Sequence, residues 1–233
     1  MAIAIILAGG IGQRVGNSIP KQFLIIDGKP VIIHTLKRFQ QCSEISGIVV
    51  VCVEGWEETL QKMAKENGIT KLMLVVKGGI NGMASTFNGL KCLADKIDRK
   101  EIVLIHDSVR PLITTDVIVD CIRVCEKYGN GCASIPMQET IVRTKDHVSG
   151  NENIDRSDIM RVQTPQAYRY WEIMDTYERA YSEGVEDSVY ANTLFLQMGG
   201  TIFFSKGSVY NLKVTTPTDL DLLETIMIRQ SDA

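Results

Sequence analysis

The sequence predicts a doubly wound α/β fold around a mainly parallel sheet, on three observations. Short apolar runs alternate with amphipathic stretches of helical period along the first half of the chain. These runs are continuous and rich in β-branched residues, which is typical of strands covered on both faces of a parallel sheet. A glycine-rich segment follows the first run, where ligands of such sheets bind. The length of 233 residues suits a single domain spanning residues 1–233.

Four strand–helix units are expected before residue 130, and their recurrence is what predicts the doubly wound arrangement. The expected strands are 3–7, 47–53, 72–76 and 102–106, and the expected helices are 31–41, 56–67, 85–97 and 115–128.

The pattern changes after about residue 133. A strand at 135–144, a polar turn-rich segment at 145–157 and a strand at 159–163 predict a hairpin or arm that projects from the sheet. Beyond it we expect helices at 170–184 and 189–198, a strand at 201–205 and a closing helix at 218–229.

Composition excludes several classes of function. The net charge of −3 and pI near 5.7 lack the basic footprint of a nucleic-acid-binding protein. No apolar run approaches the ~20 residues of a membrane span. The six cysteines form no CxxC pair, so we interpret them as buried thiols of a reducing compartment. We therefore expect a cytoplasmic protein with neither nucleic-acid nor membrane partners.

The glycine-rich segment after the first strand carries the strongest chemical signal. Gly9, Gly10 and Gly12 allow the backbone to approach a ligand closely, and their consecutive N–H groups can surround a polyanion. Arg14 and Lys21 add two positive charges at the same place. This combination predicts a phosphate-binding loop.

The loop is the first of five ordered motifs, and together they resemble the sugar-phosphate nucleotidyltransferases. The P-K-Q form is similar to the methylerythritol phosphate and ribitol phosphate cytidylyltransferases. The resemblance implies a Rossmann-like nucleotidyltransferase fold that transfers CMP from CTP to a polyol phosphate, with Mg²⁺ as cofactor. The motifs are LAGGIGQR at 7–14 with PKQF at 20–23, GG with a serine at 78–85, HDSVRP at 106–111, QTPQ at 163–166 and NLKVTTPTDL at 211–220.

Such a reaction is an attack by a phosphate oxygen on the α-phosphorus of a nucleotide. The nucleophile is already an anion, so catalysis should come from positioning and charge neutralisation. We therefore expect Arg14, Lys21 and, by resemblance, Lys213 to be catalytic, because they can neutralise the α-phosphate and the departing pyrophosphate.

Asp107 ends the fourth expected strand, where a lone carboxylate suits Mg²⁺ or a ribose hydroxyl. By resemblance, Gly79 and Ser85 recognise the base. Gly82 stands where the family's pattern usually has an arginine, so either another cation compensates or the nucleotide is held differently. The expected nucleotide contacts are Leu7, Ala8, Gly9, Gly10, Gly79, Ser85, Asp107 and Ser108.

The segment at about 137–160 resembles the family's dimerisation arm, which implies a homodimer with an isologous interface. In that family a threonine and an arginine of one subunit's arm complete the acceptor site of the other. The segment 186–190 departs from the family's pattern, so the acceptor's identity stays open there. The expected acceptor contacts are Arg110, Thr140, Arg156, Thr164 and Asp187.

Two acceptors compete. The segments HDSVRP and NLKVTT resemble the ribitol enzymes, whereas DRS at 155–157 and QTPQA at 163–167 resemble the methylerythritol enzymes. We favour D-ribitol 5-phosphate, whose product CDP-ribitol serves surface polymers such as teichoic acid. 2-C-methyl-D-erythritol 4-phosphate, an isoprenoid precursor, is the alternative. A UTP-dependent enzyme and a non-catalytic nucleotide-binding regulator are further alternatives, although a regulator would not need the full set of charged residues.

Overall fold

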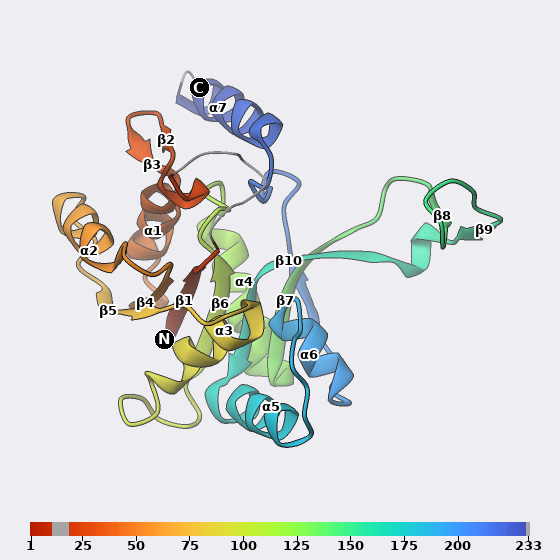
Figure 1. The fold of residues 1–233 in the computed structure, drawn as a ribbon, viewed down its shortest axis with the longest axis horizontal. Coiled ribbons are helices and arrows are strands. Elements are labelled where there is room, and N and C mark those ends of the chain that lie inside the picture. Colours follow the sequence, from red (N-terminus) through yellow and green to blue (C-terminus); the bar gives the residue numbers. More distant parts are fainter. Residues whose placement is uncertain (11–18, 232–233) are drawn as a thin grey trace.

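The computed structural model describes residues 1–10 and 19–231, and its centre is a seven-stranded sheet in the order β11-β7-β10-β6-β1-β4-β5. β1 pairs in parallel with β4 and β6, whereas β10 runs antiparallel between β6 and β7 (Figure 1). The mainly parallel sheet expected from the sequence is therefore confirmed. The strands are β1 (Ala2–Ala8), β4 (Ile45–Cys52), β5 (Leu72–Lys77), β6 (Ile102–Asp107), β7 (Asn130–Pro136), β10 (Met160–Arg169) and β11 (Phe204–Lys206).

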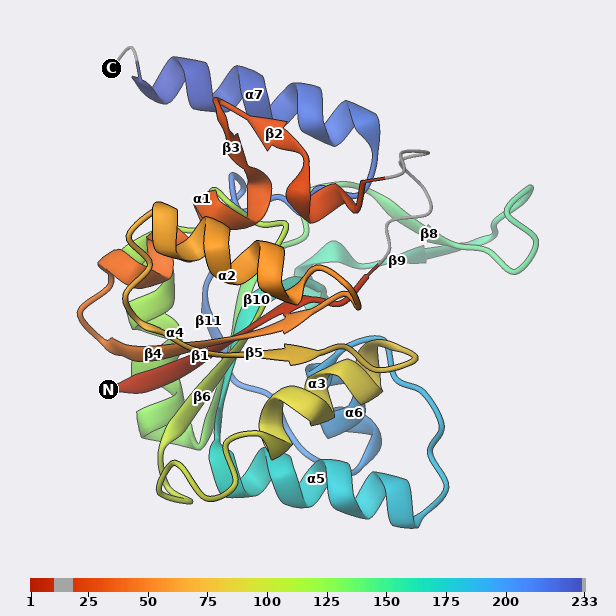
Figure 2. The same ribbon diagram turned by 60° about the vertical axis from the view of Figure 1, so that its left-hand side comes forward.

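Helices cover both faces of this sheet (Figure 2). One face packs against α1 (Val31–Gln41), α2 (Glu57–Glu66) and α4 (Thr115–Tyr128). The other packs against α3 (Gly82–Lys91), α5 (Tyr170–Ser182) and α6 (Ala191–Gln197). The predicted doubly wound arrangement is therefore confirmed.

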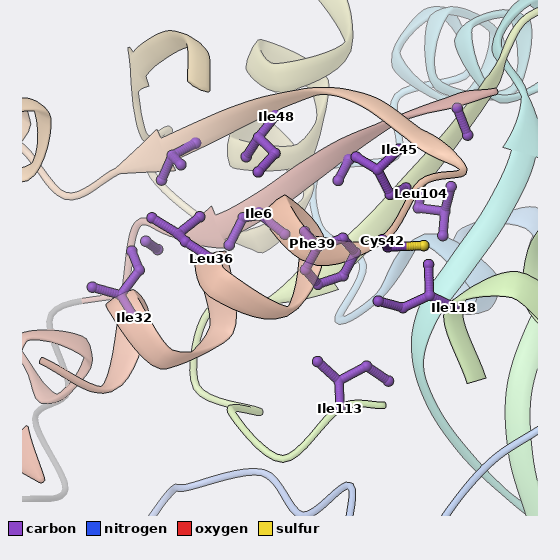
Figure 3. Close-up of a cluster of buried hydrophobic side chains, with 14 of the residues drawn as sticks. Ile6, Ile32, Leu36, Phe39, Cys42, Ile45, Ile48, Leu104, Ile113 and Ile118 are labelled. Carbon is purple, nitrogen blue, oxygen red and sulfur yellow. The ribbon is translucent and has the colours of Figure 1, made fainter. Parts of the chain in front are cut away.

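Side chains of β1 alternate between the two cores. Ala4 and Ile6 belong to the first cluster, and Ile3 and Ile5 to the second. Figure 3 shows Ile6 with apolar side chains of α1 in the first cluster. Because β1 is buried on both faces, its sequence reads as a continuous apolar run. All six cysteines are free thiols, and five of them are buried.

A short hairpin, β2 (Ile25–Ile26) with β3 (Lys29–Pro30), follows the turn of 3₁₀ helix η2 (Lys21–Phe23). The closing helix α7 (Pro217–Ser231) packs over this hairpin in a third, smaller cluster that contains Ile26, Val109 and Leu223 (Figures 1 and 2). No helix among the described residues is both long and apolar enough to cross a membrane.

The arm expected at about 137–160 projects well beyond the sheet (Figures 1 and 2). It contains β8 (Ile141–Arg143) paired antiparallel with β9 (Glu152–Ile154), followed by the 3₁₀ turn η3 (Arg156–Asp158). β7 and β10 connect it to the sheet. The projection is thus confirmed, while its role in dimerisation stays a prediction.

The prediction of a single strand at 135–144 was wrong. β7 begins at Asn130 and ends at Pro136, and β8 is a separate strand. Residues 130–134, NGCAS, are small or polar and lack the β-branched signal. They form a strand because β10 and β11 pair with them on both sides.

Other boundaries also differ from expectation. The antiparallel strand expected at 159–163 continues to Arg169, with a register shift between Val162 and Gln166. Helix α3 begins at Gly82 instead of 85 and ends at Lys91 instead of 97. Its start is set by Asn81, whose Oδ1 accepts a hydrogen bond from the Ala84 N–H at 2.8 Å.

Candidate active site

A cavity of about 410 Å³ lies at the carboxyl ends of β1 and β6. This is the edge at which the parallel strands of an open α/β sheet present their following loops to a ligand. Most of the residues expected to form the site line it together: Leu7, Ala8, Gly9, Gly10, Lys21, Gly79, Ser85, Asp107, Ser108, Thr164 and Lys213.

Asp107 is the charged centre of this lining. Its Oδ1 accepts a hydrogen bond from Lys213 Nζ at 2.9 Å, and its Oδ2 accepts one from Arg110 Nε at 2.9 Å. Burial by itself would raise the pKa of this carboxyl, but the charges and hydrogen bonds of Lys213 and Arg110 outweigh burial and lower the pKa to about 2. Asp107 is therefore a carboxylate at neutral pH, and it holds two cations beside the cavity.

His106 points away from the cavity into the core and orients its neighbours. The Thr164 hydroxyl accepts a hydrogen bond from the Asp107 N–H and can donate to His106 Nδ1 at 3.0 Å, while His106 Nε2 lies 3.4 Å from the Arg110 carbonyl oxygen. Burial lowers the pKa of His106 to about 3, so the ring is neutral. His106 is therefore a structural histidine of the core.

Gly9 and Gly78 approach each other closely, and Gly79 lies against the start of α3. A Cβ on Gly79 would lie 2.4 Å from the Ala84 Cβ, and one on Gly78 would lie 3.2 Å from the Gly9 Cα. The Ser85 hydroxyl accepts a hydrogen bond from the Gly79 N–H at 3.0 Å. Only glycine permits this contact between two strand ends, and the serine fixes it.

Gln22 is a residue whose role the sequence analysis missed. Its side chain is buried, and its Nε2 donates to the carbonyl oxygens of Ala8 and Gly10 at 2.7 and 3.0 Å. The amide thereby ties the glycine segment to η2, which carries Lys21. The P-K-Q motif contained the available signal, because it places an amide side chain directly after Lys21.

Tyr190 is a second missed residue. Its ring centroid lies 4.9 Å from Lys213 Nζ, and its hydroxyl oxygen lies 3.5 Å from the same nitrogen. The departure of residues 186–190 from the family's pattern was the available signal. Asp187, which was expected to contact the acceptor, is exposed and does not line the cavity, whereas Val189 and Tyr190 do.

The remaining expected residues lie elsewhere. Thr140 and Arg156 are on the projecting arm, where Arg156 Nη1 donates to the Gln138 carbonyl oxygen at 2.7 Å, and neither lines the cavity of its own chain. Arg110 lies behind Asp107 and lines an adjoining smaller cavity. Arg14 lies outside the described residues.

Asp107 is also the residue expected to bind Mg²⁺. It is the one carboxylate among the described residues of the lining, and no group of three or more potential metal ligands occurs in the described part of the chain. A Mg²⁺ at this place would therefore take most of its ligands from substrate phosphates and water, which is the usual manner in which this ion binds with nucleotides.

Comparisons with known proteins identify the family of the chain. The model of the IspD family, described as 2-C-methyl-D-erythritol 4-phosphate cytidylyltransferase, matches residues 2–229. A ribitol-5-phosphate cytidylyltransferase of Lacticaseibacillus paracasei is 42% identical over 96% of this chain and 97% of its own length. A 2-C-methyl-D-erythritol 4-phosphate cytidylyltransferase of Clostridium acetobutylicum is 34% identical over 99% of each chain.

Among solved structures, the 4-diphosphocytidyl-2C-methyl-D-erythritol synthase of Anaerococcus prevotii superposes with a TM-score of 0.81. It is 23% identical and covers 97% of each chain, which shows that the fold is shared. With a matching fold, a matching family model and relatives of this identity along nearly the whole length, the chain belongs to the IspD family of cytidylyltransferases.

Proposed function

We propose that this protein transfers CMP from CTP to D-ribitol 5-phosphate, with CDP-ribitol and pyrophosphate as products. The observation that carries the choice of acceptor is the 42% identity to the Lacticaseibacillus paracasei ribitol-5-phosphate cytidylyltransferase along almost the whole of both chains. As the family resemblance implies, the product would serve as an activated pentitol for a surface polymer such as teichoic acid.

In this reaction a phosphate oxygen of the acceptor forms a bond to the α-phosphorus of CTP while the bond from that phosphorus to the pyrophosphate oxygen breaks. Lys21 and Lys213, which both line the cavity, would neutralise the charge that builds on the α-phosphate and on the pyrophosphate. Arg14, outside the described residues, is proposed for the same role. No general base is needed, because the attacking phosphate is already an anion.

The nucleotide is proposed to lie over the glycine contact, with its base toward Gly79 and Ser85. Asp107 would accept hydrogen bonds from ribose or acceptor hydroxyls, because its carboxylate stays ionised between Lys213 and Arg110. Mg²⁺, held mainly by the triphosphate, would supply further charge neutralisation.

We also propose that two copies assemble through the projecting arm. Thr140 and Arg156 lie on that arm and away from the cavity of their own chain, so they could reach a partner's acceptor site. The six free thiols and the use of CTP suit a cytoplasmic enzyme.

Pyrophosphate release with a panel of substrates tests this proposal. We expect kcat/KM with CTP to be at least tenfold higher for D-ribitol 5-phosphate than for 2-C-methyl-D-erythritol 4-phosphate. Preference for the methylerythritol compound would instead support the second candidate, which the 34% identity of the Clostridium acetobutylicum enzyme favours. Turnover with UTP but not with CTP, or no turnover with any pair of nucleotide and acceptor, would contradict cytidylyl transfer.

A further inference from the structure

A second cavity of about 90 Å³ adjoins the main one behind Asp107. Thr164, Gln166 and Tyr190 line both cavities, so the two cavities share one wall. The volume is several times the space that one water molecule needs, so it admits a small hydroxylated carbon unit.

The orientation of Asn192 in this cavity follows from its hydrogen bonds. The Asn192 N–H donates to Gln166 Oε1 at 2.9 Å, which identifies the oxygen of the Gln166 amide. Gln166 Nε2 must then donate to Asn192 Oδ1, at 2.8 Å. Asn192 Nδ2 is left facing away from Gln166, and it has no hydrogen-bond partner among residues 1–10 and 19–231.

Asn192 is only 7% exposed and lines the small cavity, and its Nδ2 is not among the fully buried atoms without a partner, so it is accessible to an occupant of the cavity. An N–H group without a protein partner at the wall of a cavity favours a ligand that supplies an acceptor oxygen. The cavity therefore has a built-in preference for a polar occupant.

Arg110 adds a second donor from the opposite direction. Its Nε donates to Asp107 and its Nη1 to the Asn211 carbonyl oxygen at 2.7 Å, while Nη2 has no partner within the described part of the chain. The side chain is 8% exposed and lines the same small cavity. Asp107 shares its single negative charge between Arg110 and Lys213, and Arg110 Nη2 can still donate to a hydroxyl oxygen.

We propose that the small cavity is the subsite for the terminal hydroxymethyl group of the acceptor, and that Asn192 is a specificity-determining residue there. The inference rests on the proposed function and extends it to a particular group of the substrate. D-Ribitol 5-phosphate has an unbranched five-carbon chain whose far end is a hydroxymethyl group. That group supplies the acceptor oxygen that Asn192 Nδ2 and Arg110 Nη2 lack.

The methylerythritol compound fits this subsite worse. Its chain is one carbon shorter, so its own terminal hydroxymethyl group reaches less far into the small cavity, and the methyl branch on the neighbouring carbon adds bulk there. A site that hydrogen-bonds a hydroxyl discriminates strongly against a substrate that places no hydroxyl there.

The test compares D-ribitol 5-phosphate with 1-deoxy-D-ribitol 5-phosphate, which lacks only the terminal hydroxyl. For the wild type we expect kcat/KM to be at least tenfold lower with the deoxy compound. In Asn192→Leu we expect kcat/KM for D-ribitol 5-phosphate to fall at least tenfold while that for the deoxy compound changes less than threefold. Thr193→Leu, at the next and exposed position of α6, is the matched control and should behave as the wild type.

Binding of CTP, measured by calorimetry, should be unchanged in Asn192→Leu, which separates loss of an acceptor contact from general damage. Equal use of the two ribitol compounds by the wild type, or an unchanged ratio in Asn192→Leu, overturns the subsite while the proposed function stands. A wild-type preference for 2-C-methyl-D-erythritol 4-phosphate overturns the proposed function and this inference together. The wild-type comparison decides the matter even if Asn192→Leu does not fold.

Discussion

Asp107 and Lys213, 106 positions apart in the chain, form an ion pair of 2.9 Å between Oδ1 and Nζ in the lining of the main cavity. The Val214 N–H donates to the Val109 carbonyl oxygen at 3.0 Å, so the segment that carries Lys213 lies against the segment that follows Asp107. The lysine is one quarter exposed toward the cavity. Its charge is thus held beside a space in which phosphates can bind.

Lys213→Met is expected to lower kcat by about 10²–10³-fold, because one charge that stabilises the transition state is lost. Steady-state pyrophosphate release measures it. Lys206→Met is the control, since Lys206 makes an exposed ion pair with Asp116 on α4 and lies outside the cavity lining. A loss of less than threefold in Lys213→Met would contradict the catalytic role.

Asp219 is expected to position Lys213 through the turn before α7. Its Oδ2 accepts hydrogen bonds from the Thr215 N–H at 2.7 Å and the Thr216 N–H at 2.8 Å. These two residues follow Lys213 by two and three positions. Asp219→Ala should lower the free energy of unfolding by about 1 kcal/mol, as loss of a helix cap does, and should lower kcat more than it raises KM for CTP. Urea unfolding and steady-state kinetics measure the two effects.

Asp221→Ala is the matched control for this variant, because Asp221 is an exposed carboxylate of the same helix. If Asp219→Ala lost stability but kept the wild-type kcat, Asp219 would be a cap of α7 only. If the two variants had the same stability and the same kcat, Asp219 would neither cap α7 nor position Lys213.

Stability should fall in mild acid because His106 is buried as a neutral ring. Burial lowers its folded-state pKa to about 3, below the usual 6.5, so the unfolded chain binds the proton more readily. The contribution of His106 to the free energy of unfolding is therefore complete above about pH 6.5 and is lost as the pH falls below that value. Between pH 7 and 5 this linkage amounts to about 2 kcal/mol of the free energy of unfolding.

Urea unfolding at several pH values tests this linkage, and His106→Asn should show a shallower pH dependence than the wild type. Asp107 does not interfere in this window. Its pKa is lowered from 3.8 to about 2, so its contribution is lost only below about pH 4. His147→Asn, on the exposed arm, should leave the slope unchanged. An identical slope in His106→Asn would show that another group is responsible.

Gly82→Arg should lower KM for CTP severalfold by adding a cation to the lining of the main cavity. A Cβ at this position would lie 3.5 Å from the Val189 carbonyl oxygen, an ordinary contact, so the substitution should not strain the start of α3. Gly82→Ala is the control, because it adds the Cβ without the charge. Equal KM values for the two variants would show that the charge does not reach the nucleotide.

The regular elements could be predicted because their patterns are local. Helices α1 and α4 have the predicted bounds, since a period of 3.6 residues and a buried stripe are visible within one segment. β7 could not be predicted, because its small residues form a strand only where β10 and β11 pair with them. The start of α3 depended on one capping side chain, Asn81.

The sequence by itself determined which chemical groups the site offers: a glycine-rich turn, a basic pair and a carboxylate after a buried strand. It also determined their location, because these groups lie near the ends of predicted strands. Only the tertiary structure decided which of these groups meet. It joined Asp107 to Lys213, tied the glycine segment to η2 through Gln22, and set Asn192 and Tyr190, instead of Asp187, beside the cavities. The physical reason is that residue type and hydrophobic period can be read within one short segment of the sequence. Contacts between residues far apart in the chain depend instead on how the strands pair and how the loops close.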